Sequence, residues 1–148
     1  MEYAVSGEGG RRRFFLKLEP GEELLSTLST FAKRMRISGA SLTAIGAVKD
    51  TELGWFDIEA KTYLTRIFPD VLELLSLNGN IASSDEGILV HLHATAAGKD
   101  LTPVGGHVCA STCAVTIEAF VQETVFDLER IQDDRFNLCL LHLPKHCE

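Results

Sequence analysis

The chain carries, over residues 88–110, two strand-like segments with a turn-forming segment between them: Ile88-Leu89-Val90-His91-Leu92-His93-Ala94-Thr95-Ala96, then Ala97-Gly98-Lys99-Asp100-Leu101-Thr102-Pro103, then Val104-Gly105-Gly106-His107-Val108-Cys109-Ala110. The outer segments have the apolar and β-branched composition of strands, and the Gly- and Pro-containing segment favours a chain reversal. We therefore predict an antiparallel hairpin with its turn centred near Asp100. In such a hairpin, residues whose numbers sum to about 200 face each other.

Three histidines of this hairpin are predicted to converge. Alternate side chains of a strand share a face, so His91 and His93 project together, about 6.5–7 Å apart along the strand. The predicted register places His107 opposite His93. Three imidazoles with an open fourth position are typical of a catalytic or exchangeable zinc site. We interpret His91, His93 and His107 as ligands of one divalent transition metal, with zinc as the expected ion; the alternative for each is an ordinary structural or exposed histidine.

Three neighbours of the histidines are further candidates. Cys109 falls opposite His91 in this register, where a thiolate would close the metal site and water would leave it open; the sequence leaves both alternatives standing. Gly105 and Gly106 are candidate cofactor-binding residues, because glycine permits close approach of the backbone. A Gly-Gly pair also often marks a bulge, which would shift the predicted register.

The ordered set of motifs resembles the plant-and-prokaryote conserved (PPC) domain family. The segments that carry the resemblance are LEPGEE (18–23), SLTAIGA (41–47), ELLSLNGNI (73–81), ILVHLH (88–93), VGGHV (104–108) and VTIEAFV (115–121). The resemblance covers about residues 12–143. It implies an α+β domain that assembles as a homotrimer, with the three-histidine cluster in bacterial members, and it implies no settled reaction.

Glu118 is a candidate for a supporting role at the site. Val115, Ile117, Ala119 and Val121 supply one apolar face of a predicted strand, and Glu118 faces the other way. The resemblance to the family's glutamate at this point implies a carboxylate that orients a histidine ligand or a bound water. Simple exposure on a polar strand face is the alternative. No catalytic residue is identified, and enzymatic activity is left open.

Composition places the chain among ordinary globular proteins. Its 148 residues are 45% hydrophobic and 24% charged, which fits one domain with its own core. We predict a flexible N-terminal tail over residues 1–10 and a single domain over residues 11–148. No apolar run reaches the ~20 residues of a membrane helix. The start of the chain lacks the basic region and apolar core of a signal peptide, so we expect a cytoplasmic protein. The four cysteines include no C-x-x-C pair, so we expect free thiols.

The acidic balance argues against a general affinity for nucleic acid. The 14 basic and 21 acidic residues give a net charge of −7, which repels a polyanion unless basic residues are clustered. Arg11, Arg12 and Arg13 form such a cluster, either as a small nucleic-acid-contacting arm or as a solvated entry into the first strand. Plant relatives in the resembled family carry an AT-hook with an Arg-Gly-Arg-Pro core, which this sequence lacks.

Periodicity predicts one long helix followed by strands. Pro20-Gly21-Glu22-Glu23 is typical of a helix start, the helix should run to about Arg36, and Gly39 marks its exit. A stripe of Leu24, Leu28, Phe31 and Met35 is interpreted as core packing. The predicted strands are 13–19, 41–48, 51–58, 62–68, 71–81, 88–96, 104–110, 114–125 and 136–143. Residues 69–75 are left open between strand and short helix.

The fold class is therefore α+β: a largely antiparallel or mixed twisted sheet with one long N-terminal helix packed on it. Two functions from different classes fit this chain. The first is a metal-dependent binder or enzyme for a small molecule, in which the ion acts as a Lewis acid at a pocket between subunits. The second is a DNA-associated regulatory or assembly module without catalysis.

Overall fold

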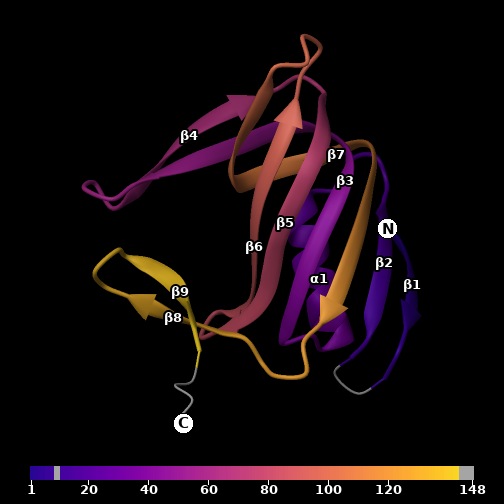
Figure 1. Ribbon diagram of the computed structural model, residues 1–148, viewed down its shortest axis with the longest axis vertical. Coiled ribbons are helices and arrows are strands. Elements are labelled where there is room, and N and C mark those ends of the chain that lie inside the picture. Colours follow the sequence, from indigo (N-terminus) through magenta and orange to yellow (C-terminus); the bar gives the residue numbers. More distant parts are fainter. Residues whose placement is uncertain (9–10, 144–148) are drawn as a thin grey trace.

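The computed structural model describes residues 1–8 and 11–143. The fold is α+β, as the sequence predicts, with one helix in the described part of the chain and a large sheet (Figure 1). The elements are β1 (Glu2–Ser6), β2 (Arg13–Leu18), α1 (Leu24–Met35), β3 (Gly39–Asp57), β4 (Thr62–Phe68), β5 (Leu72–Ser84), β6 (Gly87–Ala97), β7 (Pro103–Glu123), β8 (Glu129–Asp133) and β9 (Leu138–His142). Within residues 1–8 and 11–143, no helix has the length and apolar character that crossing a bilayer requires.

Antiparallel pairing joins most of the strands. β7 pairs with β2, β3 and β6, while β5 pairs with β3 and β6. The pairings β3–β5–β6–β7–β3 therefore close into a ring. Two hairpins, β3–β4 and β8–β9, extend to the same side of this ring (Figure 1). The β8–β9 hairpin joins the sheet through a parallel contact between Ser83 of β5 and Glu129 of β8.

β3 and β7 each run along two parts of the ring, because each strand bends and then continues to pair beyond the bend. The sequence predicts two shorter strands in place of each, with a break near Asp50 in the first. In the structure Asp50 has a φ of 48°, and the register of β3 against β7 shifts on both sides of it. A bulge bends a strand and lets pairing resume beyond it. At this bend the buried hydroxyls of Thr51 and Ser111 form a hydrogen bond of 2.9 Å, which satisfies both groups.

Helix α1 begins close to its predicted start. The carboxylate of Glu23 accepts hydrogen bonds from the backbone N–H groups of Leu25 at 3.1 Å and Ser26 at 2.7 Å, so it caps the first turn. The helix ends at Met35, and Arg36 has the left-handed conformation, with φ of 55°, that ends many helices. The predicted exit at Gly39 is wrong, because the chain has already turned and Gly39 begins β3.

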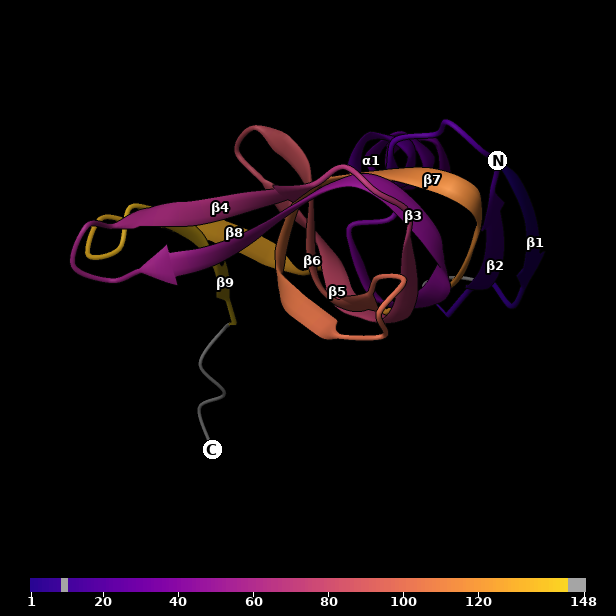
Figure 2. The ribbon, with the colours of Figure 1, turned by 90° about the horizontal axis from the view of Figure 1, so that it is seen from above.

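Helix α1 lies on one face of the sheet (Figure 2). Its apolar stripe packs into the core, as predicted. The helix contacts β6 and β7, and the ring of Phe31 meets that of Phe14 in β2 edge to face, with centroids 5.2 Å apart. The buried side chains of this layer include Leu16, Leu18, Leu24, Leu28, Leu42, Leu92, Ile117 and Val121. Burial of each large apolar side chain contributes roughly 1.5–3 kcal/mol, so this layer stabilises the sheet that carries the histidines.

Two local expectations differ from the structure, and one point that the sequence left open is decided by it. Residues 2–6, expected within a flexible tail, form β1 and pair with β2, because the ring of Tyr3 packs on Phe31 at 5.5 Å and the amino group of Met1 meets Glu22 at 2.8 Å. Residues 72–75 belong to β5, so the short-helix alternative is wrong there. Strand β8 is not predicted, because its sequence ERIQD has no apolar alternation.

Candidate metal centre

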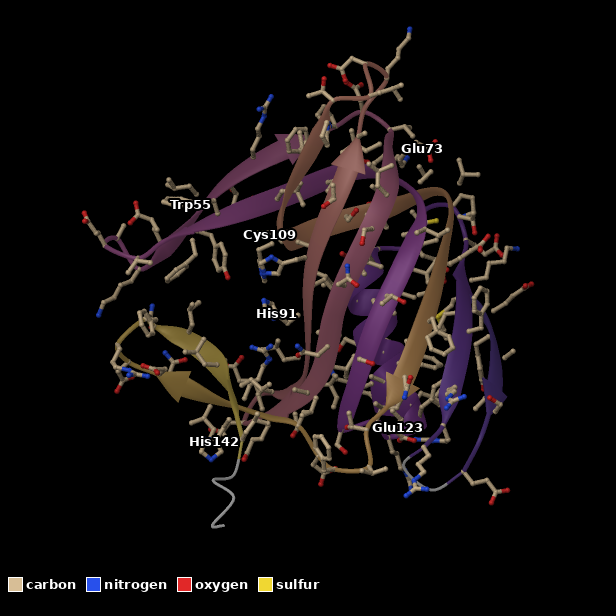
Figure 3. All side chains as sticks on the ribbon, viewed as in Figure 1. Trp55, Glu73, His91, Cys109, Glu123 and His142 are labelled. Atoms are coloured by element: carbon tan, nitrogen blue, oxygen red, sulfur yellow. The ribbon has the colours of Figure 1, made fainter. Side chains whose placement is uncertain are left out.

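The β6–β7 hairpin has the predicted register. His93 pairs with His107, and the ladder continues to Ala97 opposite Pro103. The carboxylate of Asp100 accepts the N–H of Thr102 at 3.1 Å, which helps to close the turn. The side chains of the labelled His91 and Cys109 point to the side from which the β3–β4 and β8–β9 hairpins extend (Figure 3). The predicted alignment of the strands is thus confirmed.

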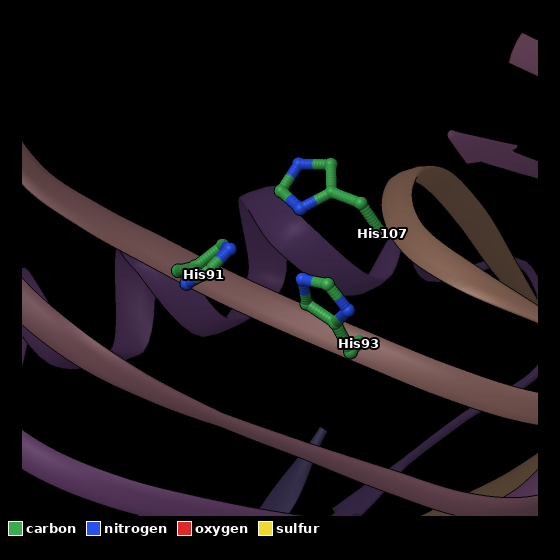
Figure 4. Close-up of side chains that lie close together, drawn as sticks. All are labelled: His91, His93 and His107. Atoms are coloured by element: carbon green, nitrogen blue, oxygen red, sulfur yellow. The ribbon is translucent and has the colours of Figure 1, made fainter. Parts of the chain in front are cut away.

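The three histidine side chains converge on one region (Figure 4). The ring centroids lie 5.1 Å apart for His91 and His93, 5.0 Å for His91 and His107, and 5.4 Å for His93 and His107. One ring nitrogen from each lies within 4.8 Å of the other two. Within residues 1–8 and 11–143, this is the one cluster of three His, Cys, Asp or Glu side chains with such geometry.

Gly105 and Gly106 let β7 approach both of its neighbours. A Cβ on Gly106 would lie 2.7 Å from the carbonyl oxygen of Gly54 in β3, and one on Gly105 would lie 2.9 Å from that of Ala94 in β6. Real Cβ atoms essentially never lie this close to a backbone oxygen, so a side chain at either position would force the backbone to shift. The two glycines therefore help to place the adjacent His107. Their cofactor-binding role stays a prediction.

The ring of His107 is held on one face and has an unused nitrogen. Tyr63 of β4 stacks on it, with centroids 4.6 Å apart and 22° between the ring planes. The Nδ1 atom of His107 is buried and has no hydrogen-bond partner in the described part of the chain. Buried polar atoms are usually paired. An unpaired imidazole nitrogen beside two other imidazoles fits a metal ligand.

The surroundings keep the imidazoles of His91 and His107 neutral. Burial, the positive charge of Arg130 and the neighbouring imidazoles of His107 and His93 lower the pKa of His91 from 6.5 to about 4. Burial, His93 and Arg130 also lower the pKa of His107. Neutral imidazole is the form that binds a metal. Zinc–nitrogen distances of about 2.0–2.1 Å put tetrahedral ligand atoms about 3.4 Å apart, so small side-chain rotations would bring these nitrogens to zinc geometry.

Arg130 is a site residue that sequence reasoning missed. It comes from β8, and it is 7% exposed. Its Nη2 donates to Nδ1 of His91 at 2.9 Å and to Oδ1 of Asn80 at 3.0 Å, while Nη1 donates to the carbonyl oxygen of Cys139 at 2.9 Å. An arginine in a charged segment has the sequence signature of a surface residue. Only the fold of the β8–β9 hairpin reveals its contact with His91.

Cys109 does not join the cluster. The β6–β7 ladder ends at the pair His93 and His107, where β7 also pairs with Gly54 of β3, so Cys109 does not pair with His91 as predicted. Its sulfur lies outside the group of converging nitrogens. Burial and the nearby charge of Glu52 raise the pKa of this thiol, which disfavours the thiolate that a metal needs. The predicted position of Cys109 is therefore wrong, and the structure gives no support to a closed four-ligand site.

The remaining cysteines behave as expected where they are described. Cys109, Cys113 and Cys139 are free thiols. Cys147 lies outside the described residues.

Glu118 lies on the exposed face of β7, as predicted. Together with Phe15, Ile45 and Phe120 it lines a shallow hollow on the sheet. The hydrogen bonds of the three histidines in the described residues do not include it. Its supporting role stays a prediction.

Val115, predicted on the apolar face, is instead 63% exposed, because β7 bulges against β3 at this point.

The basic triplet is not a free cationic arm. Nη2 of Arg12 donates to Glu123 at 2.6 Å and to the carbonyl oxygen of Met35 at 2.9 Å, and Nε donates to Glu123 at 2.9 Å. Arg12 thus ties β2 to the end of β7. Arg11 and Arg13 are exposed, so two cations of the triplet face solvent.

Comparison with known families and solved structures agrees with the motifs. The model of the Plants and Prokaryotes Conserved (PCC) domain matches residues 5–125. The crystal structure of a plant- and prokaryote-conserved (PPC) protein from Pyrococcus horikoshii is 28% identical to this chain, with a TM-score of 0.84 over 97% of this chain and 96% of that chain. A protein from Archaeoglobus fulgidus described as metal-containing is 31% identical, with a TM-score of 0.82 over 96% of this chain and 97% of that chain.

A third structure shows the same fold at lower identity. The protein comes from Bacteroides thetaiotaomicron and is described as a candidate DNA-binding protein. It is 24% identical, with a TM-score of 0.85 over 95% of this chain and 96% of that chain. No curated protein matches the chain.

Proposed function

Because the chain belongs to the Plants and Prokaryotes Conserved domain family, we propose that His91, His93 and His107 bind one divalent transition-metal ion, with zinc as the expected metal. The observation that carries this proposal is the approach of one nitrogen of each ring to within 4.8 Å of the other two. Such an ion supplies Lewis acidity for ligand binding or small-molecule chemistry. The proposed function is therefore that of a metal-dependent small-molecule binder or enzyme.

Three features of the site support this proposal. The lowered pKa values of His91 and His107 keep both rings in the metal-binding form at neutral pH. His107 has a buried Nδ1 without a protein partner in the described residues. His93 is exposed, so an exchangeable ligand has access to the fourth position that three histidines leave open. The description of the Archaeoglobus fulgidus protein as metal-containing agrees with these features.

Metal analysis tests the site directly. Protein purified without an affinity tag should contain, or take up from added zinc, about one ion per chain, as one three-histidine site predicts. Replacement of His91, His93 and His107 by alanine should abolish uptake. The matched control is His142→Ala, because His142 lies exposed in β9 and outside the cluster. A well-folded wild-type protein that refuses zinc would falsify the proposal.

We further propose that the chain forms one domain and assembles as a homotrimer. The family resemblance implies this assembly. Exposed apolar side chains on the sheet support it: Phe15, Ile45, Leu75 and Phe120 are each between 40% and 56% exposed. Three of them, Phe15, Ile45 and Phe120, line one hollow and form a patch that a neighbouring subunit would cover.

A further inference from the structure

Arg130 is a buried cation with no carboxylate partner in the described part of the chain. The residue is 7% exposed, and none of the salt bridges in residues 1–8 and 11–143 includes it. An ion taken out of water is costly unless an opposite charge or a full set of hydrogen bonds compensates for it. The partners of Arg130 are all neutral: an amide oxygen, a backbone carbonyl and an imidazole nitrogen. The guanidinium is therefore only partly compensated.

The guanidinium also has donors to spare. Arginine carries five N–H groups, and three of them serve Asn80, His91 and the carbonyl of Cys139. Nε is buried and has no partner in the described residues. Guanidinium groups with available N–H donors are the usual partners of carboxylate and phosphate oxygens.

The contact with His91 links Arg130 to the proposed metal site. Arginine only donates, so Nδ1 of His91 accepts the bond from Nη2, and the proton of the neutral ring lies on Nε2. A metal on Nδ1 would take the lone pair that the guanidinium uses. A metal on Nε2 would leave the ring proton on Nδ1. Two N–H groups would then face each other, and the hydrogen bond from Nη2 would be lost. Metal binding by His91 therefore releases one N–H of Arg130 in either case.

We propose that Arg130 binds the carboxylate or phosphate group of a small-molecule ligand beside the three histidines. This inference rests on the proposed metal site and names the class of ligand that the site takes. With the ion bound, a dication and a guanidinium would be neighbours. A single oxyanion would then offset the positive charge of both. The N–H that His91 releases and the unpartnered N–H of Nε are the donors that receive it.

The position of Arg130 favours a small ligand over a polymer. A residue that is 7% exposed has little surface for a nucleic-acid backbone, and the chain's net charge of −7 repels polyanions. Tyr63, which stacks on His107, and Asn80, which accepts from Arg130, are neutral and carry hydrogen-bonding groups. They suit the polar remainder of a small organic acid or phosphate.

The test uses cobalt, whose visible spectrum reports changes among its ligands, with acetate and inorganic phosphate as separate probes. Cobalt-loaded wild-type protein should show a saturable spectral change with at least one probe, and the responding probe identifies the preferred oxyanion. Arg130→Gln should weaken that binding at least tenfold, the order expected for loss of a charge-assisted hydrogen bond. Arg130→Lys should be intermediate, because lysine keeps the charge without the planar fork. Arg135→Gln, an exposed position in the same hairpin, is the matched control and should bind like wild type.

The metal content of each sample separates the two proposals. Wild-type protein that takes up no cobalt overturns the metal site and this inference with it. One cobalt per chain without a saturable response to either probe overturns this inference alone, and so does Arg130→Gln protein that binds the probe as tightly as wild type. If Arg130→Gln protein does not fold, the wild-type titration and Arg130→Lys decide the question.

Discussion

At the scale of single residues, His91 couples the stability of the metal-free protein to pH. Its pKa of about 4 in the folded protein lies below the ordinary value of 6.5. Between these two values the unfolded chain binds a proton that the folded chain does not, so this stabilisation is complete above pH 6.5 and is lost as the pH falls through about 4. We expect a loss on the order of 2 kcal/mol, because one pKa unit corresponds to about 1.4 kcal/mol and solvent screening reduces the full amount.

Urea unfolding of chelator-treated protein at a series of pH values measures this loss. His91→Gln keeps an acceptor for Arg130 but cannot take up the proton, so its profile should be flatter. His142→Gln, at an exposed position, should keep the wild-type profile. An unchanged slope in His91→Gln would show that another group is responsible.

Gly106 should tolerate no side chain. The Cβ of Gly106→Ala would lie 2.7 Å from the carbonyl oxygen of Gly54, so β3 and β7 must separate locally and His107 must shift. We expect a loss of about 1–3 kcal/mol in the free energy of unfolding, as for other overpacked sites, together with weaker zinc uptake. Gly98→Ala is the control, because its nearest contact is an ordinary 3.5 Å. Thermal melts and metal content compare the two, and equal behaviour would contradict the packing role.

The convergence of the histidines follows from local rules that the sequence displays. Alternation along β6 places two of them on one face, and the short turn near Asp100 sets the partner of His93. No local rule of this kind predicts the position of Arg130. It reaches His91 through the packing of a separate hairpin, and nothing within its own segment records that contact. The predicted position of Cys109 was wrong for a related reason, since the β6–β7 ladder ends at His107 and does not reach Cys109.

At the scale of elements, Glu23 should determine the stability of the start of α1. Its carboxylate caps two backbone N–H groups, so Glu23→Ala should cost about 1 kcal/mol, and Glu23→Asp should recover most of that loss. The control is Glu19→Ala, which removes a surface ion pair with Lys17 that contributes little. Chemical denaturation compares the three variants. A Glu23→Ala protein as stable as Glu19→Ala would refute the capping role.

Element types were more predictable than element lengths. The helix and most strands have strong periodic patterns, because their inward side chains form the core. The bends in β3 and β7 have turn-like sequences, and a sequence pattern does not distinguish a bulge inside a strand from a turn between two strands. β8 carries no pattern because its buried residue is Arg130, a charged group that contacts His91.

At the scale of the whole molecule, the exposed patch of Phe15, Ile45 and Phe120 should hold the proposed trimer together. Phe120→Glu places a charge in the patch and should shift the mass measured by light scattering from three chains to one, because burial of that charge is unfavourable. Leu101→Glu, at a position that is 79% exposed in the β6–β7 turn, should leave the mass unchanged. A wild-type protein with the mass of one chain would reject the assembly.

The three imidazoles belong to one local hairpin, whereas the guanidinium that contacts His91 comes from a hairpin near the C-terminal end of the described chain. Short loops close sooner than long ones, and chains begin to fold while they are being synthesised. On the ribosome, the three proposed metal ligands are therefore synthesised before Arg130, which competes for Nδ1 of His91. We expect nascent protein to acquire its ion more readily than finished apoprotein does, so the history of a preparation would govern its occupancy.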